Sequence, residues 1–383
     1  MSHFYRNILL IVLLLSSNII RAADNVMENP KSKNSISVGV MLPLHNVDGD
    51  GRRMIEYYRG LLMACDQLKS EGFHIDIHSW NVPVDADVKQ TLLDSYANKC
   101  DLIFGPLYSK QVKPLSEFCK AYNIKLVIPF SITGNDVVYN TNIYQVYQDN
   151  ARVNASTINA YIERFSESHP VFIDCNDSTS RKGDFTSSLR KILDAKKISY
   201  NITNLKSSDD SFVKAFSRSK QNVVILNSDH YKELSLAITK LDRMSSLYPG
   251  FVVSMFGYTE WLIYANYDFN NFCRYDTYIP TVFYHNPYSA ATTSLEKSYR
   301  GWFNEEMQPA QPRFAITGYD HAQYFIRGIA KFGSKFVGSK SQNVYSSLQT
   351  PLCFEKIGKG GYVNTSFMLI HYLYNHSIES LAY

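Results

Sequence analysis

The sequence predicts an α/β protein of two lobes, each a doubly wound parallel sheet, with crossing strands between them. Strand-like and helix-like segments alternate from residue 36 onward, as they do in βαβ units. The alternation restarts after residue 147, which indicates a second unit of the same kind. The chain has 383 residues, of which 45% are hydrophobic and 14% aromatic, so it can fill two large cores.

The first lobe begins with a β-branched, apolar run that ends in a Gly/Asp loop. Its expected strands cover residues 36–44, 73–80, 101–104 and 125–129, and its expected helices cover 52–69, 87–98 and 110–122. Helical spacing is clearest in the first helix, where one face carries Ile55, Tyr58, Leu62, Cys65 and Leu68. Strands that alternate with helices of this length are expected to run parallel.

The second lobe follows an extended segment at residues 143–147. Its expected helices cover 151–166, 185–193, 210–217 and 231–244, and its expected strands cover 171–174, 199–202, 222–226 and 250–255. Residues 277–284 are typical of an extended crossing segment, and 294–307 and 319–332 of two further helices.

The C-terminal part contains two more predicted strands, at 353–356 and 367–374. They flank a Gly-rich turn at 358–361, which favours a hairpin. The resulting division assigns residues 36–146 and 286–335 to the first lobe, and residues 147–285 and 336–383 to the second.

The first 23 residues have the features of a signal peptide. Arg6 supplies a positive charge, residues 8–15 form an unbroken apolar run, and Ala22 and Ala23 are small residues suited to cleavage. Residues 24–35 are predicted to be a flexible lead-in. No later stretch approaches the roughly 20 apolar residues of a membrane helix, so we expect an exported chain without a transmembrane segment after cleavage.

Composition argues against a nucleic-acid partner, because Lys plus Arg number 39 against 35 Asp plus Glu and form no concentrated basic face. The six cysteines are spread along the chain without a CxxC pair. Cys65 and Cys119 lie in helical patterns beside apolar residues, which favours buried free thiols over disulfides.

Two short patterns have some features of cofactor sites. His74, Asp76 and His78 share one strand face, but the histidine Cα atoms would be about 13 Å apart, too far for one zinc ion, so an exposed edge strand is favoured. The loop at 48–51 lacks the third glycine of a dinucleotide motif and carries two acids. We therefore expect no metal, no cofactor and no enzymatic activity.

Four segments carry a resemblance to a known family: VGVMLPL at 38–44, DLIFGPLYS at 101–109, IPFS at 128–131 and FAITGYD at 314–320. In their order and spacing, the chain resembles the type I periplasmic binding proteins of the leucine-binding class over residues 36–375. The resemblance implies two doubly wound lobes joined by crossing strands, with a ligand held between them.

Ser109 is the first candidate ligand-binding residue. It follows a predicted strand and opens a helix, and helix N-termini at the carboxyl ends of parallel strands stabilise anions. The resemblance implies that Ser109 binds the carboxylate of an amino-acid ligand, assisted by a polar pair after the next strand. Here Ile132 stands where the family has a threonine, so Ser131 or Thr133 is expected to substitute. A simple helix cap is the competing interpretation of Ser109.

On the second lobe, the resemblance places an acid that holds the ligand ammonium at or beside Glu260. The competing interpretation is a solvated loop carboxylate. Tyr258 lies two residues earlier, and one or two tyrosines near the crossings are expected to line the site. These tyrosines are Tyr144, Tyr147, Tyr258, Tyr264, Tyr284 and Tyr288.

The expected function is an extracytoplasmic solute-binding protein that closes its lobes on a small polar, amino-acid-like ligand, with hinges near Tyr147 and residues 284–286. The alternative is a non-transport envelope scaffold that binds a protein or a peptidoglycan-related ligand. Residues 42–44 and 105–107 are similar to the lipoprotein activators of peptidoglycan synthases, although the leader lacks a lipobox cysteine. A transporter or an envelope protein stays open as a further partner.

Overall fold

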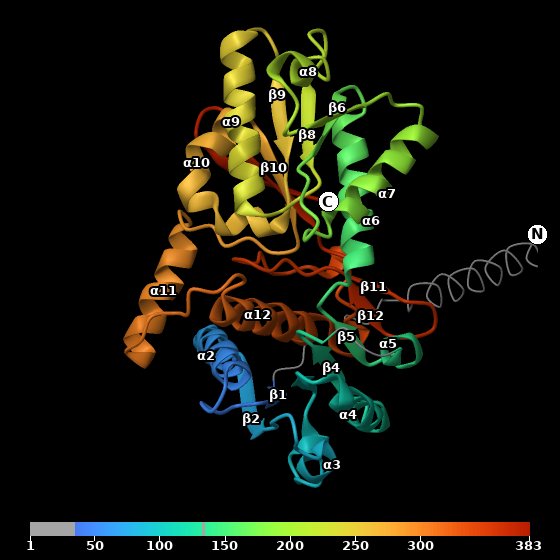
Figure 1. The fold of residues 1–383 in the computed structure, drawn as a ribbon. Coiled ribbons are helices and arrows are strands. Elements are labelled where there is room, and N and C mark those ends of the chain that lie inside the picture. Colours follow the sequence, from blue (N-terminus) through green and yellow to red (C-terminus); the bar gives the residue numbers. More distant parts are fainter. Residues whose placement is uncertain (1–34, 132–134) are drawn as a thin grey trace, which may run out of the picture.

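The computed structural model describes residues 35–131 and 135–383 as two α/β lobes, one above the other in Figure 1. Each lobe is built on one seven-stranded sheet. The strand order is β11-β12-β5-β4-β3-β1-β2 in the first lobe and β14-β13-β10-β9-β8-β6-β7 in the second. The predicted α/β class with two lobes is therefore confirmed. The predicted signal peptide and lead-in lie outside the described residues, apart from Ser35.

Parallel strands form most of the first sheet. They are β1 (Ser35–Leu42), β2 (His74–Asn81), β3 (Leu102–Phe104), β4 (Lys125–Ile128) and β5 (Ile143–Gln145). At the far edge, β11 (Phe354–Lys356) and β12 (Tyr362–Asn364) form an antiparallel hairpin, and β12 runs parallel to β5. The edge position of β2 confirms the interpretation of residues 74–78 as an edge strand.

Each face of the first sheet has its own apolar core. One core lies beneath α2 (Gly49–Ser70), α12 (Phe314–Phe332) and α11 (Ala290–Phe303), and the other beneath α3 (Val88–Thr91), α4 (Ser109–Ala121) and α5 (Asp136–Tyr139). The helix α2 begins after Asp48, whose carboxylate accepts a hydrogen bond from the backbone N–H of Gly51 at 2.7 Å. Short 3-10 turns lie at Ala97–Lys99, Gly333–Lys335 and Lys340–Gln342.

The second sheet repeats the pattern. Its parallel strands are β6 (His169–Asp174), β7 (Asn201–Asn204), β8 (Asn222–Leu226), β9 (Val253–Phe256) and β10 (Thr277–Thr281). The edge strands β13 (Met368–Tyr372) and β14 (Ile378–Ala382) are antiparallel. The helices are α6 (Asn150–Phe165), α7 (Lys182–Ala195), α8 (Asp209–Val213), α9 (Tyr231–Leu247) and α10 (Ala265–Arg274), with a 3-10 turn, η2, at Thr259–Ile263.

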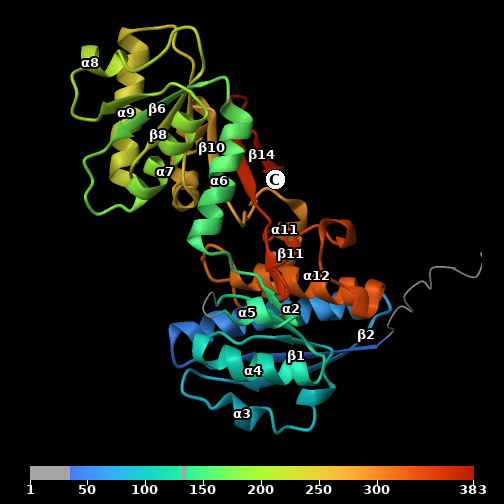
Figure 2. The same ribbon diagram turned by 90° about the vertical axis from the view of Figure 1, so that its right-hand side faces the viewer.

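The chain passes between the lobes at three places, visible in Figure 2: after β5, after β10 and after β12. The first and third crossings are tied together, because the Gln148 side chain donates to the Ser366 carbonyl at 2.7 Å. The second is tied to the first lobe by the Tyr284 N–H, which donates to the Gln349 carbonyl at 2.9 Å. The residues expected as hinges, Tyr147 and 284–286, lie on the first two crossings, and their hinge role stays a prediction.

The division of the C-terminal part needs a correction. Residues 354–364 form β11 and β12 of the first sheet, so the assignment of all of 336–383 to the second lobe is wrong for these residues. The predicted hairpin exists, but the strand after the Gly-rich turn is β12, whereas residues 368–372 cross to the second sheet as β13. Strand β12 has only three residues, too few for a periodic signal. The longer apolar run that follows it in the sequence, at 367–374, therefore dominated the prediction.

The predicted helix at 87–98 is shorter than expected, because only Val88–Thr91 is α-helical. The carboxylate of Asp94 accepts hydrogen bonds from the Tyr96 backbone N–H at 2.8 Å and from the Trp80 ring N–H at 3.1 Å. An aspartate that bonds a backbone N–H two residues later favours a turn over a helix, and this local bond replaces the helix.

The cysteine prediction agrees with the structure. Cys65 and Cys119 are buried, as are Cys100, Cys175 and Cys273, and Cys353 is half-buried; all six are free thiols. In the described part of the chain, no helix is both long enough and apolar enough to cross a membrane.

Candidate functional site

The carboxyl ends of the parallel strands in each sheet face the other lobe. Strands β5 and β10 are parallel members of their sheets, and each leads directly into a crossing. A hydrogen bond at 3.5 Å from the Gln311 side chain, just before α12, to the Leu262 carbonyl, just after β9, supports this orientation. Ligands of open parallel sheets bind outside these strand ends, so the two facing edges are the candidate site.

On the first lobe, the predicted pair Ser109 and Ser131 comes together. Ser109 is the first residue of α4, and Ser131 follows β4 and is 7% exposed. Their hydroxyl oxygens lie 3.2 Å apart. The N-cap of α4 is Tyr108, which makes no side-chain capping bond, so Ser109 is not the helix cap of the competing interpretation. Thr133 lies outside the described residues.

The same edge contains Tyr108, which the sequence analysis did not identify as a candidate. The Tyr108 hydroxyl donates to the Asp50 carboxylate at 3.3 Å, which links the start of α4 to the start of α2. Burial, together with the negative charges of Asp50 and Asp48, raises the pKa of Tyr108 to about 12. The group therefore stays a neutral hydrogen-bond donor beside Ser109.

On the second lobe, Glu260 lies in η2, directly after β9, and pairs with a lysine. The Lys182 ammonium is 2.7 Å from the Glu260 Oε1 atom and 3.8 Å from the Asp229 Oδ2 atom. We call Lys182, Glu260 and Asp229 the Lys182 cluster. Glu260 is 44% exposed, so it is partly solvated, as the competing interpretation expects, and it is also paired with Lys182.

Lys182 and Asp229 were missed in the sequence analysis, although their positions carried a signal. Lys182 is the first residue of α7, the helix that follows β6, just as Ser109 is the first residue of the helix that follows β3. Asp229 follows β8 in the same way. The charge pairing itself depends on three separate loops and cannot be predicted from any one of them.

The ring of Tyr258 packs against the ammonium group of the Lys182 cluster. Its ring centroid is 4.9 Å from the Lys182 ammonium, a cation–π contact. The ring is buried, and its hydroxyl donates to the Leu226 carbonyl within the same lobe. Burial raises the pKa of Tyr258 well above its usual value. Tyr258 therefore contributes its ring, while its hydroxyl is already bonded.

A second polar cluster lies beside the first, at the start of α9. Asp177, His230 and Glu233 each bring one possible metal-ligand atom within 4.8 Å of the others. The Asp177 carboxylate already accepts hydrogen bonds from Thr179, from Ser228 at 2.7 Å and from His230 at 2.7 Å. These bonds, led by the one from Thr179, hold the pKa of Asp177 well below its usual value. The group thus joins two segments of this edge, the loop after β6 and the loop after β8, through hydrogen bonds of its own.

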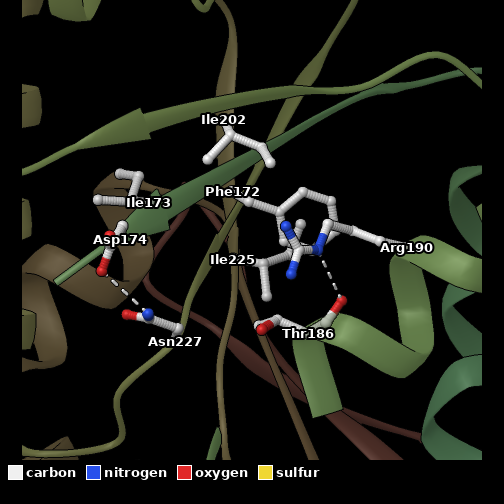
Figure 3. A pocket seen from close by; sticks show the side chains of 8 residues that line it. All are labelled: Phe172, Ile173, Asp174, Thr186, Arg190, Ile202, Ile225 and Asn227. Carbon is white, nitrogen blue, oxygen red and sulfur yellow. Dashed lines mark hydrogen bonds between the residues drawn. The ribbon is translucent and has the colours of Figure 1, made fainter. Parts of the chain in front are cut away.

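Figure 3 shows a small cavity within the second lobe, between α7 and the sheet. Its volume is about 150 Å³, and it is lined by Phe172, Ile173, Asp174, Thr186, Arg190, Ile202, Ile225 and Asn227. Asp174 accepts a hydrogen bond from the Asn227 side chain at 3.1 Å, and Arg190 donates to the Thr186 carbonyl at 3.4 Å. Typical ligand sites measure roughly 300–1,000 Å³, so this cavity is smaller than most ligand sites.

No family model and no curated protein matches this sequence. Among solved structures, a protein from Rhodospirillum rubrum, assigned provisionally as a branched-chain amino acid ABC transporter, is similar at 11% identity. The match covers 91% of this chain and 100% of that one, with a TM-score of 0.58. A substrate-binding protein of an ABC transporter from Desulfitobacterium hafniense is similar at 12% identity; the match covers 91% of this chain and 100% of that one, with a TM-score of 0.48. At these identities the likeness shows the fold alone: the chain has the type I periplasmic binding protein fold, as the resemblance implied.

Proposed function

We propose that this chain is an extracytoplasmic solute-binding protein that closes its two lobes on a small polar ligand. The observation that carries the proposal is the meeting of the Ser109 and Ser131 hydroxyls, 3.2 Å apart at the N-terminus of α4, on the edge that faces the second lobe. Serine hydroxyls at a helix N-terminus are suited to bind a carboxylate or a similar anion.

The second lobe supplies the other half of the proposed site. The Lys182 cluster lies on the facing edge, and its partly exposed charged atoms would meet the opposite end of a ligand. The crossings after β5 and β10 would act as hinges when the lobes close. The predicted leader at 1–23 supports export, and the fold supports binding rather than catalysis as the activity.

A thermal-shift screen of the chain without its predicted leader tests this proposal. The compounds are amino acids, 2-oxo and 2-hydroxy acids, short peptides, sugars and muropeptides. A ligand at 100 times its Kd adds about 2.7 kcal/mol to the free energy of unfolding, which raises Tm measurably. Ser109→Ala and Ser131→Ala should each weaken binding roughly tenfold, the cost of one hydrogen bond to a charged group.

Ser188→Ala is the matched control, because Ser188 is an exposed residue of α7 whose hydroxyl bonds only the Asp184 carbonyl in its own helix. This variant should bind as the wild type does. Absence of a shift with every compound class would contradict solute binding, and would favour the envelope scaffold that binds a protein partner.

A further inference from the structure

We infer that the ligand is a carboxylate with a 2-oxo or 2-hydroxy group, rather than a 2-amino acid, because Lys182 already supplies the ammonium that an amino acid would bring. This inference rests on the proposed function and names the ligand class of the same site.

The acid expected to hold a ligand ammonium is already paired within the protein. The Lys182 ammonium lies 2.7 Å from Glu260 Oε1, a full charge-assisted hydrogen bond. The same ammonium lies 3.8 Å from Asp229 Oδ2. Both carboxylates of the Lys182 cluster therefore have a cation beside them before any ligand arrives.

Neighbouring contacts hold Lys182 in this position. Its backbone N–H is 3.2 Å from the Ser180 hydroxyl, and that hydroxyl donates to Asp229 at 2.9 Å. The Tyr258 ring lies beneath the ammonium, at 4.9 Å from the ring centroid. The side chains of Lys182 and Asp229 are only 23% and 17% exposed. A pair that is partly shielded from solvent is screened less by salt than a surface pair.

The ammonium of an amino acid would therefore have to share Glu260 with Lys182, at the cost of repulsion between two like charges. A ligand oxygen, in contrast, would be attracted by the Lys182 ammonium. An ammonium group has three donors, and Lys182 uses one of them on Glu260, while Asp229 lies beyond hydrogen-bond distance. A carbonyl or hydroxyl oxygen can accept a remaining donor, which an ammonium cannot do.

Charge balance limits the ligand further. The Lys182 cluster contains one cation and two carboxylates, so it sums to one negative charge. A second carboxylate on the ligand would be repelled from this edge, whereas a neutral oxygen would not. The single carboxylate of the ligand then belongs on the first lobe, at Ser109 and Ser131.

Calorimetric titration with ligands that differ only at the 2-position tests the inference. One series is L-leucine, 2-hydroxy-4-methylvalerate and 4-methyl-2-oxovalerate; the other is phenylalanine, phenyllactate and phenylpyruvate. The wild type should bind the oxo or hydroxy acid of a series at least tenfold more tightly than the amino acid. Lys182→Met, which keeps the length and removes the charge, should reverse that order, because Glu260 then becomes available to a ligand ammonium.

Lys191→Met is the control, since Lys191 is an exposed residue of the same helix, and it should keep the wild-type order. A wild type that prefers the amino acid would overturn the inference while leaving the proposed function intact. If the wild type binds another class of compound but no member of either series, the inference is likewise overturned and the proposed function stands. Absence of binding by every compound in the screen would instead overturn the proposed function. The wild-type comparison is decisive even if Lys182→Met does not fold.

Discussion

At the scale of single residues, Glu56 is a buried carboxyl group whose ionisation opposes folding. It lies in α2 and is 1% exposed; Oε1 accepts a hydrogen bond from the Gln308 N–H, and Oε2 has no partner among the described residues. Burial raises the pKa of Glu56 from 4.5 to about 7. Between these two values the folded state keeps a proton that the unfolded state has lost. The contribution of Glu56 to stability therefore falls as the pH rises through this window.

We expect the free energy of unfolding of the wild type to fall from pH 5 to pH 8, relative to Glu56→Gln, by on the order of 2 kcal/mol. Urea unfolding at several pH values measures this. Asp320, whose pKa burial raises to about 6, and His321, whose pKa burial lowers to about 3, titrate in both proteins and cancel in the difference. Glu163→Gln, on the exposed face of α6, should show no such dependence. If the difference in free energy of unfolding between wild type and Glu56→Gln stays constant with pH, the raised pKa of Glu56 is contradicted.

At the scale of elements, the contact between α2 and α12 depends on two glycines. A Cβ atom at Gly60 would lie 1.8 Å from the Ala315 carbonyl oxygen, and one at Gly318 would lie 1.9 Å from the Tyr57 carbonyl oxygen. The two helix backbones therefore touch, and even a methyl group would force them apart. The same helices bury Tyr57 and His321, whose side chains are joined by a 2.9 Å hydrogen bond.

Gly60→Ala should destabilise the protein by about 2 kcal/mol or more, because an overpacked contact between two backbones has little room to relax. Gly301→Ala is the matched control, since its Cβ would meet no atom within 4 Å on α11, and alanine there should be neutral or slightly stabilising. Thermal unfolding of both variants compares them. Equal Tm values would show that α2 and α12 are farther apart than the structure indicates.

Elements with a long repeating pattern could be predicted from the sequence, and elements set by single contacts could not. The predicted helix at 52–69 lies within α2, and the predicted strand at 222–226 matches β8. The short strand β12 and the broken helix at Asp94 escaped prediction, because a three-residue strand has no period and a side-chain bond to the backbone overrides helical spacing. At the site, Ser109 could be predicted from its place after a strand, whereas Ser131 was named, with Thr133, from the family resemblance. Lys182 was not singled out, because its role depends on Glu260, far away in the sequence.

At the scale of the whole molecule, the cysteines report on how tightly both lobes are closed to solvent. Five of the six thiols are buried, in the cores of both lobes, and Cys353 is half-buried beside the third crossing. Burial raises the pKa of Cys65 to about 12 and that of Cys100 to about 11, which keeps them protonated and unreactive.

A thiol reagent at neutral pH should therefore label Cys353 alone in the folded protein, and all six cysteines after denaturation. Mass spectrometry of the labelled chain counts the modified sites. Cys353→Ser should lose the fast labelling and keep the slow labelling that requires unfolding. Rapid labelling of Cys65 or Cys119 in the native protein would mean that the first lobe opens far more readily than its packing implies.

The third crossing affects when the two sheets can be completed as the chain is made. The hairpin β11–β12 completes the first sheet beside β5, and β13 and β14, the last strands of the chain, complete the second sheet beside β10. Both sheets therefore stay incomplete until residues 354–382 have been synthesised. A nascent chain that stops before residue 354 exposes the edge of β5 in one lobe and of β10 in the other, so the two lobes complete their sheets with the same segment of the chain.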